Sequence, residues 1–522
     1  MTSPIGSIIT LSGSPLSFRQ RGLIGDGKAA IVADPAGLAR CREGRAALEA
    51  ALARGAIVYG TTTGVGAMKD RSFGVNDLLQ FNRGLVLAHH FAIGAPLPLQ
   101  VVRVALAVRV NTALSGRVGC TTELVEALIG LLNADVVPMV RGVGSIGCAD
   151  IGLMGQIGAV LTGNGEAYHG GRLMPAAEAL AAAGLQPHIM APRDALAIVS
   201  ANAVGVALAG EALARASATV RMLLATTTTA AAGLGGSRAP WEAAITVGTR
   251  FESAMGLWLM AVSDGWDWPV GTHIHDPLSL RMLPQIYGAV FDRLNDAGAE
   301  FLVSTARPDD NPIIVDGQVL ASGGSLPLNL TLTVESLATA LAHVARNAFN
   351  LCVLLANGGR RGLLANLVVP ETIATGFGPI LKLAGDLLAR VLADAAPVSA
   401  TPLVVAGGME DEATFLPLAV ERVERQIMAL QGLTAVLGLL STQAIDLSGD
   451  LPGGLVGVVR SLVREEVSLM VEDRMLSGDV EALVTRLSSV EAHRMIVEAT
   501  PPLPSDAVFL DQLWELETKD SA

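Results

Sequence analysis

The feature that most constrains this chain is a set of long apolar segments whose hydrophobic residues recur at three- and four-residue steps. One segment spans residues 420–437, where Val, Ile and Leu alternate with Glu and Arg, and a second spans residues 337–351. This spacing aligns the apolar side chains along one face of an α-helix. Strand-like stretches are short, as at residues 313–315, where a small hairpin is predicted. We therefore predict an all-α fold, a bundle of long helices with small irregular loop regions.

Low charge goes with this pattern and limits the partners of the protein. Hydrophobic residues make up 51% of the 522 residues and charged residues only 16%, so large subunit interfaces are expected to bury part of the apolar surface. The apolar stretches are interrupted before about 18 residues, and we predict no membrane span. A formal charge of −13 argues against nucleic acid or an anionic membrane as the main partner.

The cysteines indicate neither a metal site nor a disulfide framework. The four cysteines are widely spaced and form no CxxC pair. His273 and His275 have no carboxylates nearby at ligand spacing, so no metal is predicted. A reducing cytoplasm is the expected compartment, and the first residues lack the charged-then-apolar pattern of a secretory signal.

Four glycine-rich segments interrupt the helical pattern, at residues 59–66, 142–150, 322–325 and 406–411. Glycine lets the backbone take positive φ angles and approach a ligand closely, and loops on a rigid scaffold commonly carry binding and catalytic residues. None of the four fits a phosphate-binding pattern, so no nucleotide is predicted.

These segments carry a family resemblance. Residues 59–66 (YGTTTGVG) resemble the YGxxTGFG segment of the histidine and phenylalanine ammonia-lyase family, and residues 82–89 are similar to its RNLxxSH stretch. Further matches follow in the family's order, including residues 276–281, similar to its DxYSxR. The resemblance covers roughly residues 10–490. It implies an elongated all-α lyase unit, a homotetramer with shared active sites, and an amino-acid or betaine substrate.

Within this continuous unit we expect two regions. Residues 1–200 form an N-terminal helical region that carries the Tyr59 loop and the loop at residues 144–150. Residues 201–522 form the long central helix bundle and the C-terminal helices.

The resemblance fails at the family's electrophile, a methylidene-imidazolone made from Ala-Ser-Gly. Here the stretch reads Gly147-Cys148-Ala149-Asp150, without a serine and one residue short. If Cys148 takes the place of the serine, loss of hydrogen sulfide would give the methylidene, although closure through Ala149 is more crowded than through glycine. A different placement of the gap leaves no candidate. The asparagine that supports the ring falls near Ser200. We predict no cofactor, with a ring built from Cys148 as the alternative.

Two residues carry over from the family as candidates for proton transfer and substrate binding. Tyr59 matches the base that removes the β-proton, unless it is only a packed aromatic at a helix–loop junction. Arg281 matches the arginine that binds the substrate carboxylate through its bidentate guanidinium, unless it forms an internal salt bridge. The second catalytic tyrosine is replaced by Leu278. Asn311 is expected to shape the pocket.

Three further residues are candidates for reading the rest of the substrate. Glu410 matches the position that contacts or tunes the substrate ring. Lys382 stands where the family has glutamine; in a dry pocket it would act with Glu410 as an acid or base, and otherwise it is a snorkelling lysine on a helix flank. His89 falls on the family's active-site histidine, unless its ring is merely hydrogen-bonded within its helix.

Loss of the electrophile narrows the reaction. The electrophile bonds to the amine nitrogen and makes it a better leaving group, but a quaternary ammonium has no lone pair and departs unaided as a neutral amine. The sequence thus resembles the electrophile-free, ergothionase-like members of the family. It predicts a carbon–nitrogen lyase that performs a base-catalysed 1,2-elimination, releasing trimethylamine from a histidine-derived betaine such as ergothioneine. The alternatives are an ammonia-lyase or aminomutase with a ring from Cys148, a proton-transferring isomerase or cyclase, and a non-catalytic homologue.

Overall fold

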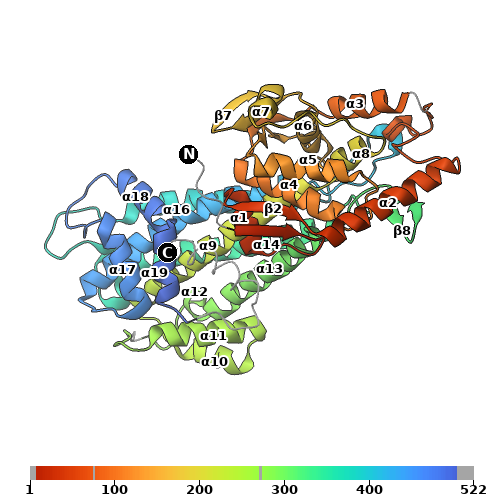
Figure 1. Ribbon diagram of the computed structural model, residues 1–522. Coiled ribbons are helices and arrows are strands. Elements are labelled where there is room, and N and C mark those ends of the chain that lie inside the picture. The colour runs from red at the N-terminus through yellow and green to blue at the C-terminus, as the bar shows by residue number, and fades with distance from the viewer. Residues whose placement is uncertain (1–6, 75–76, 270–272, 502–522) are drawn as a thin grey trace. The chain divides into compact units, whose positions relative to one another are not determined.

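A computed structural model describes residues 7–74, 77–269 and 273–501 (Figure 1). Long helices dominate it, and the predicted all-α fold is confirmed. The chain divides into two compact units, each built from three separate stretches of sequence. Unit 1 comprises residues 1–211, 299–332 and 397–420, and unit 2 comprises residues 212–298, 333–396 and 421–522. The sequence-based division into residues 1–200 and 201–522 follows the chain instead, and its outermost residues, 1–6 and 502–522, lie outside the described part.

Unit 1 contains short helices and the small sheets. Strands β1 and β2 pair in parallel, β3 pairs with β5, β6 pairs with β4 and β7, and β8 pairs with β9 in the hairpin predicted near residue 313. Its elements are β1 (Ser7–Leu11), α1 (Phe18–Gly25), β2 (Ala29–Ala33), α2 (Pro35–Ala53), η1 (Gly66–Met68), α3 (Leu78–Ala88), β3 (Ile93–Pro96), α4 (Leu99–Ala113), α5 (Thr122–Asn133), β4 (Val137–Pro138), β5 (Arg141–Val143), α6 (Ile151–Leu161), β6 (Glu166–His169), β7 (Arg172–Pro175), α7 (Ala176–Ala182), α8 (Asp194–Val199), β8 (Ile313–Val315), β9 (Gln318–Leu320) and η6 (Ala406–Gly408).

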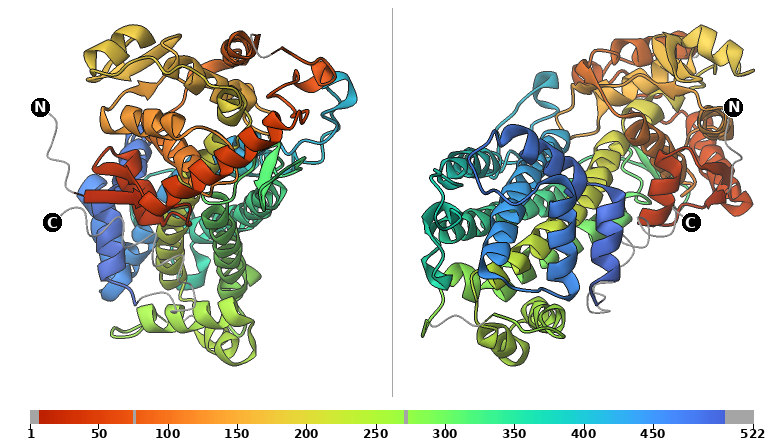
Figure 2. Two further views of the ribbon diagram at one scale, coloured as in Figure 1. Left: turned by 45° about the vertical axis from the view of Figure 1, so that its right-hand side comes forward. Right: turned by 90° about the vertical axis from the view of Figure 1, so that its left-hand side faces the viewer.

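Unit 2 holds most of the long helices, which Figure 2 shows from two further sides. The apolar residues that predicted a helix at residues 420–437 form a buried stripe on α16. The elements that lie wholly or mostly in unit 2 are α9 (Ala203–Gly233), α10 (Ala239–Val247), α11 (Arg250–Ser263), α12 (Leu278–Arg281), α13 (Leu283–Ser304), α14 (Leu328–Asn357), η3 (Gly359–Arg361), η4 (Ala365–Leu367), η5 (Gly378–Ile380), α15 (Leu381–Ala393), α16 (Leu416–Ser448), α17 (Gly454–Glu466), α18 (Ser477–Leu487) and α19 (Val490–Glu498).

We expected interruptions to keep every apolar stretch shorter than about 18 residues, and this expectation was wrong. Within the described residues, three helical segments are long and apolar enough to cross a membrane by length and composition: Asp194–Gly233, Leu328–Asn357 and Leu416–Ser448. Between 61% and 89% of their apolar windows is buried inside the protein, as in helices that form a hydrophobic core. Threonines do not interrupt such a helix, because the hydroxyls of Thr228 and Thr229 donate to carbonyls one turn earlier.

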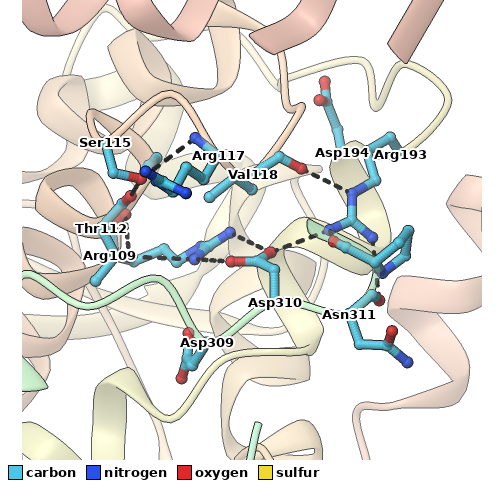
Figure 3. A network of polar contacts seen from close by, with 12 residues as sticks. Arg109, Thr112, Ser115, Arg117, Val118, Arg193, Asp194, Asp309, Asp310 and Asn311 are labelled. Atoms are coloured by element: carbon cyan, nitrogen blue, oxygen red, sulfur yellow. Dashed lines mark hydrogen bonds and ion pairs between the residues drawn. The ribbon is translucent and has the colours of Figure 1, made fainter. Parts of the chain in front are cut away.

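A buried ion network fixes the loop of unit 1 that precedes β8 (Figure 3). Arg109 donates two hydrogen bonds to the carboxylate of Asp310, of 3.0 and 2.9 Å, and Arg193 approaches the same carboxylate at 3.3 Å. Arg193 also donates to the carbonyl oxygens of Val118 and Pro312. All three charged side chains are at most 1% exposed. The Asp310 carboxylate therefore contacts two buried guanidinium groups, and the charges of Asp309 and Asp194 act on Arg109 and Arg193 respectively.

Protonation of His493 on α19 should weaken the fold in mild acid. Burial, helped by the charge of Arg221, lowers the pKa of His493 to about 4. The unfolded chain takes up this proton near the ordinary pKa of histidine, so stability falls as the pH drops from about 6.5 towards 4. Between pH 7 and pH 5 the group should cost about 2 kcal/mol. Urea unfolding of wild type and His493→Gln at both pH values measures this; the variant should lack that part of the loss.

Replacement of the exposed His273 by glutamine is the control for the His493 experiment. It should leave the pH dependence as in wild type. An unchanged pH dependence in His493→Gln would contradict the assignment.

Candidate active site

Unit 1 contains a cavity of about 1020 Å³ whose walls come from loops far apart in the sequence. The glycine-rich segments near residues 59, 148, 322 and 406 all contribute to it, together with the ends of α3 and α8. Of the residues singled out by sequence, the cavity is lined by Tyr59, His89, Cys148, Ala149, Ser200, Asn311 and Glu410. Residues from segments far apart in the sequence therefore line one cavity.

Tyr59 is held in this wall by its own loop. Its phenol oxygen accepts a 2.9 Å hydrogen bond from the N–H of Gly66. The loop turns sharply at Gly60, where φ is +61° and an added Cβ would lie 2.3 Å from the side chain of Leu196. Burial raises the pKa of Tyr59, the Gly66 N–H opposes this, and the negative charge of Glu410 raises it further. Together, burial and the Glu410 charge therefore favour the protonated phenol of Tyr59 when no substrate is bound.

The loop that corresponds to the family's electrophile is tied to neighbouring segments. Gly147 has φ +70°, and an added Cβ would lie 2.5 Å from the backbone nitrogen of Phe415, so glycine is required there. Its carbonyl accepts a 2.8 Å bond from the hydroxyl of Thr414. The N–H of Ala149 donates to the carbonyl of Ser325 at 2.9 Å. The two groups that ring closure would join are thus each hydrogen-bonded to another segment.

Cys148 presents its thiol to the cavity. Its Sγ lies 3.7 Å from the hydroxyl oxygen of Ser325. Burial raises the pKa of Cys148, the Ser325 hydroxyl opposes this, and Glu410 adds to the rise. Since the thiolate is the reactive form, the cavity favours an unreactive thiol.

Asp150 anchors the same loop through its buried carboxylate. Its carboxylate accepts hydrogen bonds from the N–H of Gly205 in the first turn of α9, at 2.6 Å, and from the hydroxyl of Ser145, at 2.8 Å. Burial raises the pKa of Asp150 to about 6 in spite of these donors. The aspartate thus positions the loop and lies behind the cavity wall.

His89 and Asn311 line the cavity, and each side chain also makes one hydrogen bond within the protein. His89 ends α3, and its Nδ1 donates to the carbonyl of Leu85 at 2.7 Å, as the alternative interpretation of this residue expected. Asn311 accepts a 2.9 Å bond from the N–H of Ser322 through its Oδ1 and so connects two wall segments. Neither is excluded from substrate contact by these bonds.

Arg281, Leu278 and Lys382 belong to unit 2. The guanidinium of Arg281 donates to the carbonyl of Asp276 at 2.8 Å, while the carboxylate of Asp276 pairs with Arg360. Leu278 is 59% exposed. Lys382, in the first turn of α15, is exposed in the single chain, so the dry surroundings expected for it are not supplied by the described residues.

Sequence reasoning missed Glu412, which lines the cavity two residues after Glu410. The available signal was its place one residue beyond the glycine-rich segment 406–411, which carries Glu410. The family motif ends at Asp411, however, and therefore gave no reason to select Glu412.

Comparisons with known proteins show the family and the fold of the chain. The family described as aromatic amino acid lyase matches residues 16–465. The histidine ammonia-lyase of Paracidovorax citrulli (strain AAC00-1) is 28% identical over 463 residues, 87% of this chain and 90% of that protein. Among solved structures, the ergothioneine-degrading enzyme ergothionase from Treponema denticola is 27% identical with a TM-score of 0.89, covering 94% of this chain and 99% of that one. Histidine ammonia-lyase from Trypanosoma cruzi, 22% identical over 97% of both chains with a TM-score of 0.86, shows the same fold.

Proposed function

The chain belongs to the aromatic amino acid lyase family of carbon–nitrogen lyases, and we propose that it eliminates a tertiary amine from a betaine without an electrophilic cofactor. The leading candidate is release of trimethylamine from a histidine-derived betaine such as ergothioneine. Ergothionase, 27% identical to this chain, degrades ergothioneine. The substrate is thus a small molecule, and the enzyme is expected to act in the cytoplasm.

The reaction needs one base and a leaving group that departs unaided. Tyr59, as the phenolate, takes the β-proton; the electrons of the C–H bond form the carbon–carbon double bond. The C–N bond breaks, and its electron pair leaves on nitrogen as a neutral tertiary amine. General-base catalysis of this kind typically contributes about 10²–10⁴-fold to the rate.

One observation carries this proposal: Tyr59 lines the same cavity as a loop that lacks a serine and reads Cys148-Ala149. The base position is retained where the usual precursor of the electrophile is missing.

The other roles are part of the proposal. Arg281 binds the substrate carboxylate, and Lys382 acts with Glu410 to polarise the substrate ring so that the β-proton becomes acidic. His89 and Asn311 shape the pocket. We propose a homotetramer with shared active sites as the active form; it would also bury apolar side chains that are exposed in the single chain, such as Leu278.

A substrate panel tests the proposed function. Purified enzyme is incubated with histidine- and aromatic-derived betaines and with the corresponding amino acids, and volatile amine and ammonia are measured separately. Trimethylamine should be released from at least one betaine, with the unsaturated acid formed in equal amount, and no ammonia from the amino acids. Ammonia release alone would contradict the proposal. Proton exchange in heavy water without any release would favour an isomerase or cyclase.

The second candidate is an ammonia-lyase or aminomutase whose methylidene-imidazolone is built from Cys148, which lines the cavity. The intact mass separates the two, because ring formation from cysteine removes one hydrogen sulfide and one water. We expect the unmodified mass, and we expect Cys148→Ala to retain betaine elimination within about tenfold, or 1.4 kcal/mol. A mass deficit that disappears in Cys148→Ala, together with loss of activity, would establish the second candidate.

A further inference from the structure

The residues just before α9 join three of the loops that form the cavity wall. Asn202 is 2% exposed, and both its backbone N–H and its Nδ2 donate to the Oδ2 of Asp309, at 2.6 and 2.8 Å. The same Nδ2 donates to the carbonyl of Ser325 at 2.9 Å. Next to it, the carbonyl of Ala201 accepts a 2.9 Å bond from the N–H of Asp150. Residues 201 and 202 therefore connect the loops near residues 150, 309 and 325, all within unit 1.

The carbonyl of Ser325 passes this connection on to the cavity. It accepts hydrogen bonds from Asn202 and from the N–H of Ala149, and the Ser325 hydroxyl lies 3.7 Å from the thiol of Cys148. Ser325, Ala149 and Cys148 all line the cavity, whereas Asn202 is not among the lining residues. The charge of Cys148 acts on the pKa of Tyr59, so the two side chains are close enough to interact. A shift of Asn202 would therefore move the wall that faces Tyr59.

The contacts of Asn202 and Asp309 are kept at a cost in stability. Among the described residues the buried Oδ1 of Asn202 has no hydrogen-bond partner, which destabilises the folded state. Burial, together with the charge of Asp310, raises the pKa of Asp309 to about 6, although Arg109 and Asn202 oppose this. Because the ordinary pKa of aspartate is about 3.9, the ionised carboxylate destabilises the fold at neutral pH. Stability alone does not explain the pair, and a role in placing the cavity wall does.

We propose that Asn202, oriented by Asp309, is a positioning residue of the active site: it fixes the carbonyl of Ser325 and thereby the place of the Cys148 loop relative to Tyr59. Where it concerns the reaction rate, this inference rests on the proposed function, since the wall must present the substrate to Tyr59. A misplacement of about 1 Å lowers an enzymatic rate by up to about 10²-fold. Asn202 acts on the reaction through Ser325, without touching the substrate.

Alkylation of Cys148 by iodoacetamide tests the proposal without turnover, because Cys148 is half-buried and the other three cysteines are buried. Asn202→Asp is nearly isosteric, but it replaces the Nδ2 donor with a carboxylate oxygen that faces Asp309 and the carbonyl of Ser325. The rate of Cys148 alkylation, followed by peptide mass, should rise about tenfold as the loop opens more often. Cys352, buried in unit 2, should stay as slow as in wild type. An unchanged rate at Cys148, or an equal rise at Cys352, would overturn the proposal.

Asn133→Asp is the matched control for this experiment. Asn133 ends α5 in unit 1, where its Nδ2 donates to the carbonyl of Ile31 at 2.9 Å and its Oδ1 accepts from the N–H of Ile31. It is not among the residues that line the cavity. The same chemical change there should leave the alkylation rate of Cys148 within about twofold. An equal rise in both variants would show that any lost asparagine opens the loop, which contradicts the proposal.

Two variants of Asp309 test the other half of the pair. Asp309→Asn keeps one oxygen, which can accept both hydrogen bonds from Asn202, whereas Asp309→Leu removes the acceptor. With the betaine identified by the panel, Asp309→Leu and Asn202→Asp should lower kcat by about 10–10²-fold and change KM less. Asp309→Asn should keep kcat within about threefold of wild type, because the acceptor is retained. Cys148 alkylation should follow the same order. Equal effects of Asp309→Asn and Asp309→Leu would overturn the assignment of Asp309 as the acceptor that orients Asn202.

The two proposals fail in different ways. If betaines are eliminated but Asn202→Asp matches wild type in both kcat and Cys148 alkylation, the function stands and the inference is wrong. If Asn202→Asp speeds the alkylation of Cys148 selectively, but no betaine on the panel releases an amine, the inference stands for the cavity wall and the proposed reaction is wrong.

Discussion

Tyr59→Phe will lower kcat for amine elimination by about 10²–10⁴-fold, the usual contribution of a general base. The change deletes one oxygen and leaves the ring in the cavity wall. The N–H of Gly66 loses its acceptor, which costs about 1–3 kcal/mol if the group stays dry. Because the oxygen acts on the proton and not on the bound ground state, KM should change much less than kcat. Steady-state kinetics with the betaine identified by the panel measure both constants.

Tyr168→Phe is the matched control for this prediction. Tyr168 lies in β6 of the same unit, where it pairs with Val137, and is not among the residues that line the cavity. Its replacement should leave kcat within about twofold, as for surface changes away from a site. If Tyr59→Phe retained activity within tenfold of wild type, the base would have to be another group.

Asp310→Asn should destabilise the protein by about 3–5 kcal/mol, the range for breaking a buried ion pair by removing one partner. The amide nearly matches the carboxylate in shape, so the change removes charge with little change in packing. It leaves the guanidiniums of Arg109 and Arg193, both 1% exposed, without their shared anion. Burial already lowers the pKa of Arg193, and the charge of Asp310 opposes this effect. Removing that charge would therefore destabilise the protonated guanidinium of Arg193 further. Urea unfolding, or the yield of soluble protein if the variant does not fold, measures the effect.

Asp135→Asn provides the comparison for Asp310→Asn. Asp135 pairs with Arg103 at 2.7 Å, but its side chain is 53% exposed, and an exposed pair contributes about 0–1 kcal/mol. An equal loss of unfolding free energy in both variants would show that burial does not increase the contribution of the Asp310 network. A loss below about 1 kcal/mol in Asp310→Asn would contradict the prediction outright.

Much of the cavity lining could be predicted because neighbouring residues in the sequence determine the conformation of its loops. The loop at residues 59–66 and the loop around Gly147 need glycine for positive φ and for close backbone approach, and those needs are visible as glycine-rich sequence. Family motifs then identified Tyr59, Asn311 and Glu410 within such loops, and all three line one cavity. Glu412 was missed because nothing local separates a lining glutamate from a solvated one.

The sequence did not reveal which candidates share a compact unit. Arg281 and Lys382 were grouped with Tyr59 by motif order, yet they belong to unit 2, while the cavity lies in unit 1. Each unit is assembled from three separate stretches, and α9, α13, α14 and α16 all contain a unit boundary. A motif fixes the identity and order of residues along the chain, and it carries no information about which body of a discontinuous fold each one joins.

The sequence by itself determined the helices, the loops and the missing electrophile precursor, because helical periodicity, glycine conformation and the absence of a serine are properties of neighbouring residues. Only the tertiary structure decided the electrostatic setting of Tyr59. The N–H of Gly66 is close in sequence, but Glu410 and the burial that raises the pKa of Tyr59 come from distant parts of the chain. Coulomb energy and desolvation depend on distance and dielectric in space, and folding alone sets both.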